Sequence, residues 1–263
     1  MIRRALISVS DPTGLEELAV ALHELGIEIV ASSGTGARIE AAGVPWLPVE
    51  QVTGAPEMLG GRVKTLHPGI HGGILARRDV PEDLARLEEL GIAEIGLVVV
   101  NLYPFRETVA QPGITDAEAI EKIDVGGPAM VRAAAKNHRA VGIVTSPSRY
   151  PEVIAELRER GGELSDETRR RLAAEAFTMT AGYDAAISTW FMGGVTLPDE
   201  IVMDLHRERE LPYGENPHQA AGYYVDRTQE RHLLTGVVQH GGKELSYNNI
   251  ADLAAAYAIA GEF

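Results

Sequence analysis

Chemically active side chains are concentrated between Gly61 and Pro68. This segment contains two cations, Arg62 and Lys64, together with the hydroxyl of Thr65 and the imidazole of His67. A guanidinium close to an ammonium suits a phosphate dianion. An ordinary core or surface element does not require this mixture of residues. The segment therefore predicts part of an enzyme site for an anionic, nucleotide-like substrate.

A second segment, Ser32-Ser33-Gly34-Thr35-Gly36, has the features of a phosphate-binding turn. It follows a predicted strand and begins a predicted helix, so its N–H groups and hydroxyls are available to an anion. Ser10 lies at the end of the preceding strand, and we expect it on the same rim. On this segment alone, a plain capped turn explains the pattern equally well, and the nearby cations favour phosphate binding.

Tyr103 follows the apolar run from Val98 to Leu102 and precedes Pro104. A tyrosine at the end of a buried strand fits a core position. It equally fits a site at the carboxyl end of a parallel sheet.

Asp124 precedes Gly126-Gly127 and a predicted helix that ends near Lys136. The carboxylate has the position of a helix N-cap, a structural role that is compatible with catalysis. In a straight helix Lys136 would lie roughly 14 Å or more from the Asp124 end. A break in the helix or a neighbouring loop would have to bring the two side chains together.

His67 and His71 have a spacing that could bind a metal ion from one face of a helix. We expect Pro68, Gly69, Gly72 and Gly73 to prevent a stable helix there, and no third ligand is apparent. No metal site is predicted, and His67 is expected either to orient the loop or to contact the substrate.

Composition excludes several classes of protein. The chain has 263 residues, of which 38 are acidic and 24 basic, and its formal net charge is −14. Nucleic-acid binding requires a basic surface, so it is not expected. The absence of cysteine excludes disulfides and thiolate catalysis. With no signal peptide and no membrane-spanning run apparent, the sequence predicts a soluble, cytoplasmic protein.

Short apolar runs alternate with amphipathic helical segments, which predicts an α/β fold with a parallel sheet covered by helices on both faces. The expected strands are Ala5–Val9, Ile27–Ala31, Ile95–Val100 and Ala140–Val144. The expected helices are Thr13–Leu25, Ser32–Gly43, Pro81–Leu90, Pro128–Asn137, Pro147–Arg160 and Ser165–Trp190. Ligands of such sheets bind beyond the carboxyl ends of the strands. We expect each motif described above to lie in a strand-to-helix loop.

The last predicted helix is interrupted at Gly193-Gly194, which we take as the end of a first domain, residues 1–194. Residues 195–263 are predicted to form an irregular junction, from Val195 to Leu211, and the truncated start of a second α/β domain.

Four sequence blocks together resemble the bifunctional purine-biosynthesis enzyme family that combines AICAR transformylase with IMP cyclohydrolase. They are Ser8–Asp11, Glu57–Pro68, Asn101–Phe105 and Asp124–His138. The resemblance implies a methylglyoxal-synthase-like fold for the first domain. It also implies ring closure of FAICAR to IMP, the last step of purine biosynthesis, without cofactor or metal. The second domain of the family transfers a formyl group from formyl-tetrahydrofolate to AICAR, and the full-length family is homodimeric.

The resemblance also implies roles for individual residues. The catalytic set is Lys64, Tyr103, Asp124 and Lys136. We expect Asp124 and Lys136 to transfer protons while Lys64 and Tyr103 stabilise the developing oxyanion. The residues implied in substrate binding are Ser10, Ser33, Gly34, Thr35, Arg62, Thr65, His67, Asn101, Gly126 and Gly127.

The chain departs from the family pattern at Pro12, where a lysine is usual, and at Pro212, where an arginine is usual. A cation near the phosphate is therefore missing at each position. The matching positions of the transformylase half are Tyr213, Asn216, His218 and Asn248. Because the segment that carries formyl-transfer chemistry in the family is not in the sequence, we expect no formyl transfer from this chain.

Two alternatives remain at the level of sequence. Methylglyoxal synthase has the same implied fold and binds a small phosphate ester. A non-catalytic nucleotide-sensing module of this fold would bind IMP without turnover. Loss of the lysine at position 12 favours a sensor, whereas retention of all four catalytic positions favours an enzyme.

Overall fold

The computed structural model describes residues 1–193, 195–228, 234 and 237–262. The chain divides into two compact units, Met1–Ala181 and Gly182–Phe263, and the division falls inside one long helix. Within the described residues, no helix combines the length and the apolar character that crossing a lipid bilayer requires.

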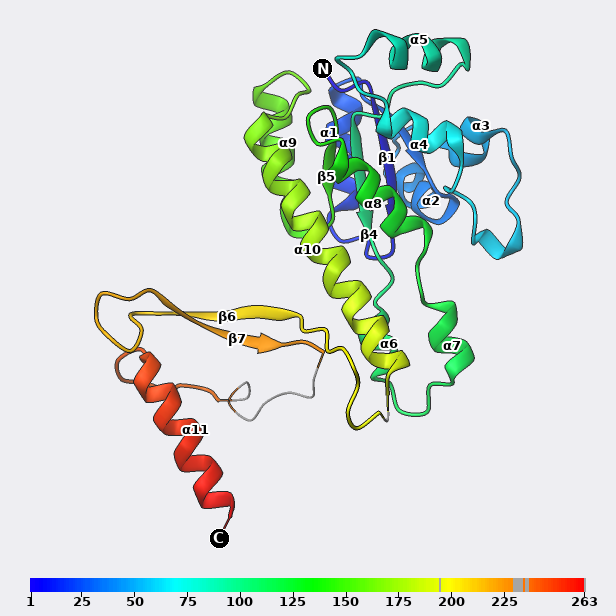
Figure 1. The fold of residues 1–263 in the computed structure, drawn as a ribbon. Helices are drawn as coiled ribbons and strands as arrows, with labels where there is room; N and C mark the ends of the chain where they lie inside the picture. Colours follow the sequence, from blue (N-terminus) through cyan, green and yellow to red (C-terminus); the bar gives the residue numbers. More distant parts are fainter. Residues whose placement is uncertain (194, 229–233, 235–236, 263) are drawn as a thin grey trace. The chain divides into compact units, whose positions relative to one another are not determined.

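The described part of the first unit contains a parallel sheet of five strands in the order β3-β2-β1-β4-β5 (Figure 1). The strands are β1 (Arg4–Val9), β2 (Glu28–Ala31), β3 (Leu47–Pro48), β4 (Leu97–Asn101) and β5 (Gly142–Val144). In the centre of the sheet, Ala5 of β1 lies opposite Ile29 of β2 and Leu97 of β4. This arrangement confirms the predicted parallel α/β fold.

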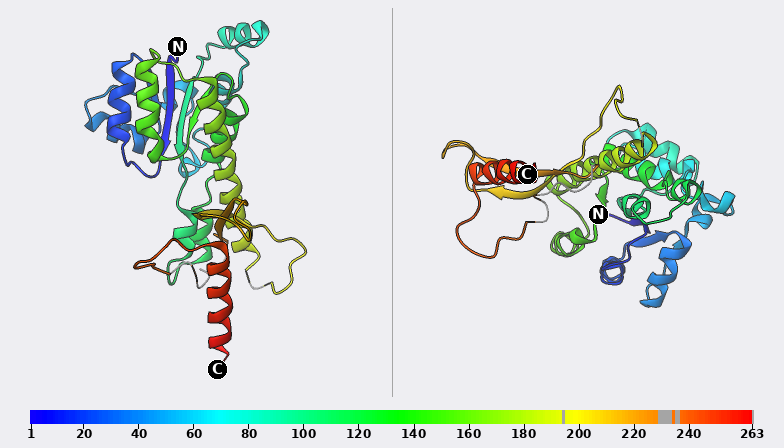
Figure 2. Two further views of the ribbon diagram at one scale, coloured as in Figure 1. Left: turned by 90° about the vertical axis from the view of Figure 1, so that its left-hand side faces the viewer. Right: turned by 90° about the horizontal axis from the view of Figure 1, so that it is seen from below.

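Helices cover both faces of the sheet. On one face α1 packs against α2 and α9, and on the other face α8 packs against α4 (Figure 2). In chain order the helices are α1 (Leu15–Glu24), α2 (Ser33–Ala41), α3 (Val49–Thr53), α4 (Pro68–Leu75), α5 (Pro81–Glu89), α6 (Phe105–Val109), α7 (Asp116–Glu121), α8 (Gly126–Lys136), α9 (Tyr150–Glu159) and α10 (Asp166–Phe191), with 3₁₀ turns at Leu59–Gly61 and Pro147–Arg149.

The core lies between these layers. Strands β1 and β4 are apolar along most of their length, and Leu6, Ile7, Val98 and Val99 are fully buried. A parallel strand covered on both faces has this continuous apolar pattern rather than alternation. Helix α1 presents leucines at helical spacing to the same core. Because the strands are parallel and buried, their carboxyl ends lie along one edge of the sheet, and the loops that follow them begin there.

The expectation that no helix could form after His67 was wrong. Helix α4 spans Pro68–Leu75, with proline at its first position and the His67 side chain accepting the N–H of Gly69. A Cβ atom at Gly73 would approach the carbonyl oxygen of Ala93 to 2.6 Å, so glycine permits a close approach there. Tertiary packing therefore outweighs the low helix propensity of these glycines.

Two further expectations require correction. Residues 122–125 join α7 to α8, and residues 54–67, which include most of the Gly61–Pro68 segment, join α3 to α4, so both are helix-to-helix connections and not strand-to-helix loops. The stretch expected to be an irregular junction contains strand β6 (Leu205–Leu211). Its sequence is rich in charged residues, and it therefore lacks the apolar pattern by which a strand is recognised.

The second unit contains an antiparallel pair of strands, β6 and β7 (Ala221–Asp226), and helix α11 (Tyr247–Gly261). The side chain of Ser246 caps α11 through a reciprocal arrangement with Asn249. Helix α11 lies within the described part of the chain, and none of its residues is buried.

Candidate active site

A cavity of about 660 Å³ opens at the carboxyl ends of β1, β2 and β4. Its walls come from the ends of β1 and β4, the start of α2, the segment before α4, and the α7–α8 junction. The volume lies within the usual range for small-molecule sites. The predicted site residues that line it are Ser10, Gly34, Thr35, Arg62, Lys64, Thr65, Asn101, Tyr103, Asp124, Gly126 and Gly127.

Lys64 is largely buried and held by three oxygen atoms. Its Nζ lies 2.8 Å from Ser33 Oγ, 2.8 Å from Glu57 Oε2 and 3.0 Å from Glu50 Oε1. Burial acts to lower the pKa of Lys64, but the bonds to Glu57 and Glu50 outweigh it and leave this pKa above its ordinary value. Lys64 is therefore a stable ammonium at neutral pH, suited to bind an anion rather than to accept a proton.

Arg62 forms an ion pair with Glu121, and both side chains line the cavity. The two side chains are 64% and 59% exposed, so the pair is solvated and contributes little to stability. Both predicted phosphate-binding cations thus have acidic partners within the protein itself.

The N-terminus of α2 faces the same cavity. Ser32 occupies the N-cap position, yet its side chain makes no capping hydrogen bond to the helix. Instead it contacts the hydroxyls of Ser8 and Thr35, and Thr35 Oγ1 accepts the N–H of Val9 at 3.1 Å. The hydroxyls thus connect β1 to α2. Helix N-terminal N–H groups beside a lysine form a suitable setting for an anion.

Asn101 fixes the loop after β1. Its Oδ1 accepts the N–H groups of Ser10 at 2.6 Å and Asp11 at 2.9 Å, and its Nδ2 donates to the Asp11 carbonyl at 2.8 Å. The Ser10 hydroxyl donates to the Leu102 carbonyl at 2.6 Å. The Ser10 hydroxyl also donates to Asn101 Oδ1, at 3.0 Å, so Asn101 holds both the backbone and the side chain of this loop and positions the rim of the cavity.

Asp124 lies at the start of α8, and its Oδ1 accepts the N–H of Gly127 at 2.8 Å. Val125 has the formal N-cap position, so Asp124 performs the expected capping role from one residue earlier. Burial raises the pKa of Asp124 and the Gly127 hydrogen bond lowers it, with burial the larger effect. A Cβ at Gly127 would lie 2.4 Å from Asp124 Oδ2, and one at Gly126 would lie 2.7 Å from Thr65 Oγ1. Both glycines thus permit close approach within the site.

Tyr103 is about half exposed and lines the cavity, which is not the position of a core tyrosine. Lys122 Nζ lies 5.7 Å from the centroid of its ring, within the range of a cation–π contact. Sequence reasoning gave no role to Lys122 or to the acids Glu57 and Glu121, although Glu57 begins one of the four sequence blocks. Their one signal in the sequence was proximity to the predicted loops.

Three predicted site residues do not line the cavity. Ser33 is linked to it through Lys64. His67 caps α4 and so has a structural role. Lys136 is exposed at the far end of α8, about 15 Å along the helix axis from Gly126. The structure therefore brings together Lys64, Tyr103 and Asp124 but does not bring Lys136 to them.

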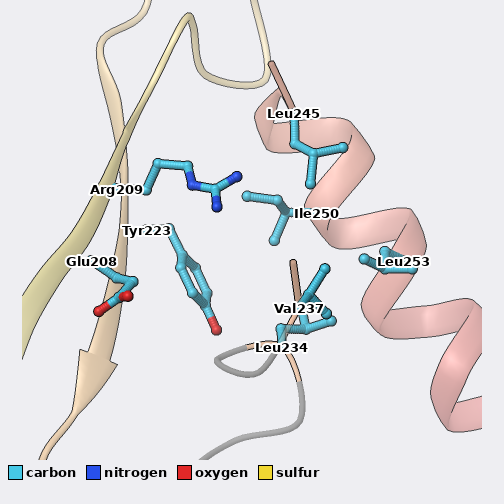
Figure 3. Close-up of a pocket in the computed structure, with 8 residues that line it drawn as sticks. All are labelled: Glu208, Arg209, Tyr223, Leu234, Val237, Leu245, Ile250 and Leu253. Atoms are coloured by element: carbon cyan, nitrogen blue, oxygen red, sulfur yellow. The ribbon is translucent and has the colours of Figure 1, made fainter. Parts of the chain in front are cut away.

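The predicted transformylase positions lie in the second unit. Tyr213, Asn216, His218 and Asn248 are all exposed. A small pocket of about 50 Å³ lies between the β6–β7 hairpin and α11, where Tyr223 and Arg209 face Ile250 (Figure 3). None of the four predicted residues lines that pocket. Among the described residues, no group of three or more histidine, aspartate or glutamate side chains is placed to hold a metal ion.

Two known families match the chain. The MGS-like domain matches residues 14–129, and the AICARFT/IMPCHase bienzyme family matches residues 134–263. Among solved structures, the crystal structure of ForH is similar with a TM-score of 0.67 and 40% sequence identity. The similarity covers 72% of this chain and 96% of ForH.

Curated relatives named "Bifunctional purine biosynthesis protein PurH" match the whole chain. The protein of Listeria welshimeri is 50% identical over 264 residues, and that of Bacillus cereus is 49% identical over 265 residues. The chain spans about half the length of these relatives, 52% in each case. It therefore belongs to the PurH family of bifunctional purine biosynthesis proteins and corresponds to their N-terminal portion, an MGS-like domain followed by the start of the AICARFT/IMPCHase region.

Proposed function

We propose that this chain is an IMP cyclohydrolase, which closes the ring of FAICAR to give IMP. The observation that carries the proposal is the meeting of Lys64, Tyr103 and Asp124 in one cavity beside the N-terminus of α2. These residues come from three separate segments. An ammonium, a phenol and a partly buried carboxyl together provide the groups that this cyclisation requires.

In the proposed reaction the carboxamide nitrogen of FAICAR attacks the formamido carbon. Each of the two nitrogens loses one proton, and both protons leave with the formyl oxygen as water. Asp124 accepts a proton from the weak nucleophile, since its position in the cavity and its raised pKa suit proton transfer. The hydroxyl of Tyr103 stabilises the negative charge that develops on the oxygen, and Lys64 contributes through its positive charge within the same cavity. Binding both groups of one substrate in a single cavity brings the reacting atoms together.

The phosphate of the substrate would lie at the N-terminus of α2, near Gly34, Thr35 and the ammonium of Lys64. Arg62 supplies a second cation on the cavity wall. With proline at position 12, these groups would carry the affinity for the phosphate.

The proton-transfer role predicted for Lys136 rests on the family resemblance alone, because Lys136 does not line the cavity. Members of the AICARFT family use formyl-tetrahydrofolate as formyl donor. We assign no formyl transfer to this chain, whose matching side chains are exposed and line neither cavity described above. For the cyclisation we propose neither a metal nor a cofactor, and the family resemblance supports a cytoplasmic location and a homodimeric full-length protein.

Tyr103→Phe tests the proposed chemistry with the least disturbance of the site. We expect the rate of IMP formation from FAICAR to fall about 100-fold, as for the loss of one oxyanion donor. Tyr257→Phe is the matched control, since Tyr257 is an exposed residue of α11 outside the cavity. A Tyr103→Phe rate within threefold of wild type would remove this hydroxyl from the mechanism. Lys136→Ala in the same assay decides whether Lys136 takes part.

A further inference from the structure

We propose that the carboxylate of Glu57 competes with the phosphate of the nucleotide for the ammonium of Lys64 and is displaced by that phosphate. The inference rests on the proposed function, because it requires a ligand that carries a phosphate group. It assigns to Glu57 a role in setting affinity, which none of the sequence motifs indicates.

The ammonium of Lys64 already has a hydrogen-bond acceptor for each of its N–H donors. A lysine ammonium has three N–H donors. In this structure Nζ has three oxygen partners, on Ser33, Glu57 and Glu50, all within 3.0 Å. An incoming anion therefore contacts Lys64 only by replacing one of these partners.

The partners of Lys64 differ in how far they are exposed to the cavity. The Glu57 side chain is 48% exposed and lines the cavity, whereas Glu50 is 25% exposed and is not among the lining residues. Ser33 is the first residue of α2 and so belongs to the proposed phosphate cradle itself. Glu57 is thus the partner that a ligand entering through the cavity meets.

The local backbone also separates the two acids. Glu50 lies within helix α3. Glu57 precedes a tight turn in which Leu59, Gly60 and Gly61 all have positive φ values, 52°, 63° and 89°. This turn brings the carboxylate of Glu57 to the ammonium of Lys64, which lies seven residues later in the sequence. A rotation of the Glu57 side chain would release Lys64 without disturbing a helix.

The negative charges of Glu57 and of a bound phosphate oppose each other. The carboxylate of Glu57 and a phosphate dianion would compete for the same ammonium and would repel each other. Arg62 is occupied in the same way by Glu121. Removing the charge of Glu57 while keeping its shape should therefore tighten binding of a phosphate-bearing ligand. If Glu57 served only to hold Lys64 in place, its removal would weaken binding.

The test is calorimetric titration of the full chain with IMP and with inosine, which lacks the phosphate, at constant low ionic strength. We expect Glu57→Gln to bind IMP about two- to fivefold more tightly than wild type, the range for loss of one competing, partly exposed ion pair. Its affinity for inosine should be unchanged. Glu89→Gln is the matched control, because Glu89 forms an exposed ion pair with Arg86 on α5, outside the cavity, and should bind IMP like wild type.

The outcomes separate the two proposals. If wild type binds IMP and Glu57→Gln binds it equally or more weakly, the displacement of Glu57 is overturned and the proposed function stands. Equal tightening for inosine would also overturn it, since the effect would not act through the phosphate. If wild type does not bind IMP, the proposed function fails and this inference with it.

Discussion

Asp124 combines a structural and a chemical role in one side chain. Its Oδ1 accepts the N–H of Gly127 and so supports the start of α8, while the carboxyl group lines the cavity. Burial raises its pKa above the 3.8 of an ordinary aspartate, against the smaller opposing effect of the Gly127 hydrogen bond. Such a shift brings a carboxyl group closer to neutral pH, where proton transfer is efficient.

This shift predicts the pH dependence of the reaction. If ionised Asp124 accepts the proton, the rate of FAICAR cyclisation should fall with decreasing pH along a limb centred above pH 3.8. Asp124→Asn should lower the rate by at least about 100-fold, within the range of general acid–base catalysis. A wild-type limb centred at or below pH 3.8, or a rate retained in Asp124→Asn, would contradict this role.

The stability of Asp124→Asn provides an independent check of the same shift. A raised carboxyl pKa means that folding favours the protonated form. The stability that wild type gains from this group is present below pH 3.8 and is lost as pH rises through the raised pKa. At pH 7 the neutral asparagine should therefore unfold at a higher Tm than wild type.

Motifs that contain glycine or proline drew attention to Lys64, Tyr103 and Asp124 in the sequence, and the structure places all three on the wall of one cavity. The sequence did not show which acids contact Lys64. Glu50 lies 14 positions earlier and Glu57 seven, and only the folded path of the chain brings both to one nitrogen. The sequence also did not show that His67 caps α4, because the glycines after His67 argued against a helix there.

At the scale of elements, strands β1, β2 and β4 and helices α1, α8 and α10 were predicted to within a few residues. Their apolar patterns are regular, and burial of the sheet requires those patterns. Short elements such as β3 and α6 have too few residues to show a period. Helix α4 was missed because propensity argued against it, while its cap and its packing favour it.

Gly34 and Gly36 of helix α2 form a matched pair of positions at which the packing of α2 can be tested by substitution. A Cβ at Gly36 would approach the Trp46 ring to 2.3 Å, whereas nothing lies within 4 Å of a Cβ at Gly34. Gly36→Ala should therefore reduce the free energy of unfolding by about 1–3 kcal/mol through overpacking. Gly34→Ala should be neutral or stabilising by up to about 1 kcal/mol, since alanine favours helix.

Denaturant unfolding of both variants measures this difference. Equal stabilities would show that Trp46 moves aside without cost, and the close packing between α2 and Trp46 would then not hold the start of α2 in place.

At the scale of the whole molecule the net charge is −14, but the charges around the cavity are balanced. Arg62, Lys64 and Lys122 line it together with an equal number of acids, Glu57, Glu121 and Asp124. Charges gathered in a cleft act on a ligand more strongly than charges spread over a surface. The same composition that argues against nucleic-acid binding is therefore compatible with binding a single nucleotide.

The two units were predictable to different degrees. The fold of the first follows from alternating apolar strands and amphipathic helices. The antiparallel hairpin of the second unit was not expected, because β6 is exposed along nearly all its length and lacks an apolar face. Without burial, the sequence carries little information about pairing.

The most direct test of the proposed function is conversion of synthetic FAICAR by the purified wild-type chain, followed by absorbance, without folate or added metal. We predict steady formation of IMP, and a loss of about 100-fold in Lys64→Met, which removes the ammonium of Lys64 from the cavity. Binding of IMP without any conversion of FAICAR would contradict the proposal and identify a nucleotide-sensing module. Turnover of dihydroxyacetone phosphate in place of FAICAR would contradict it in favour of a methylglyoxal synthase.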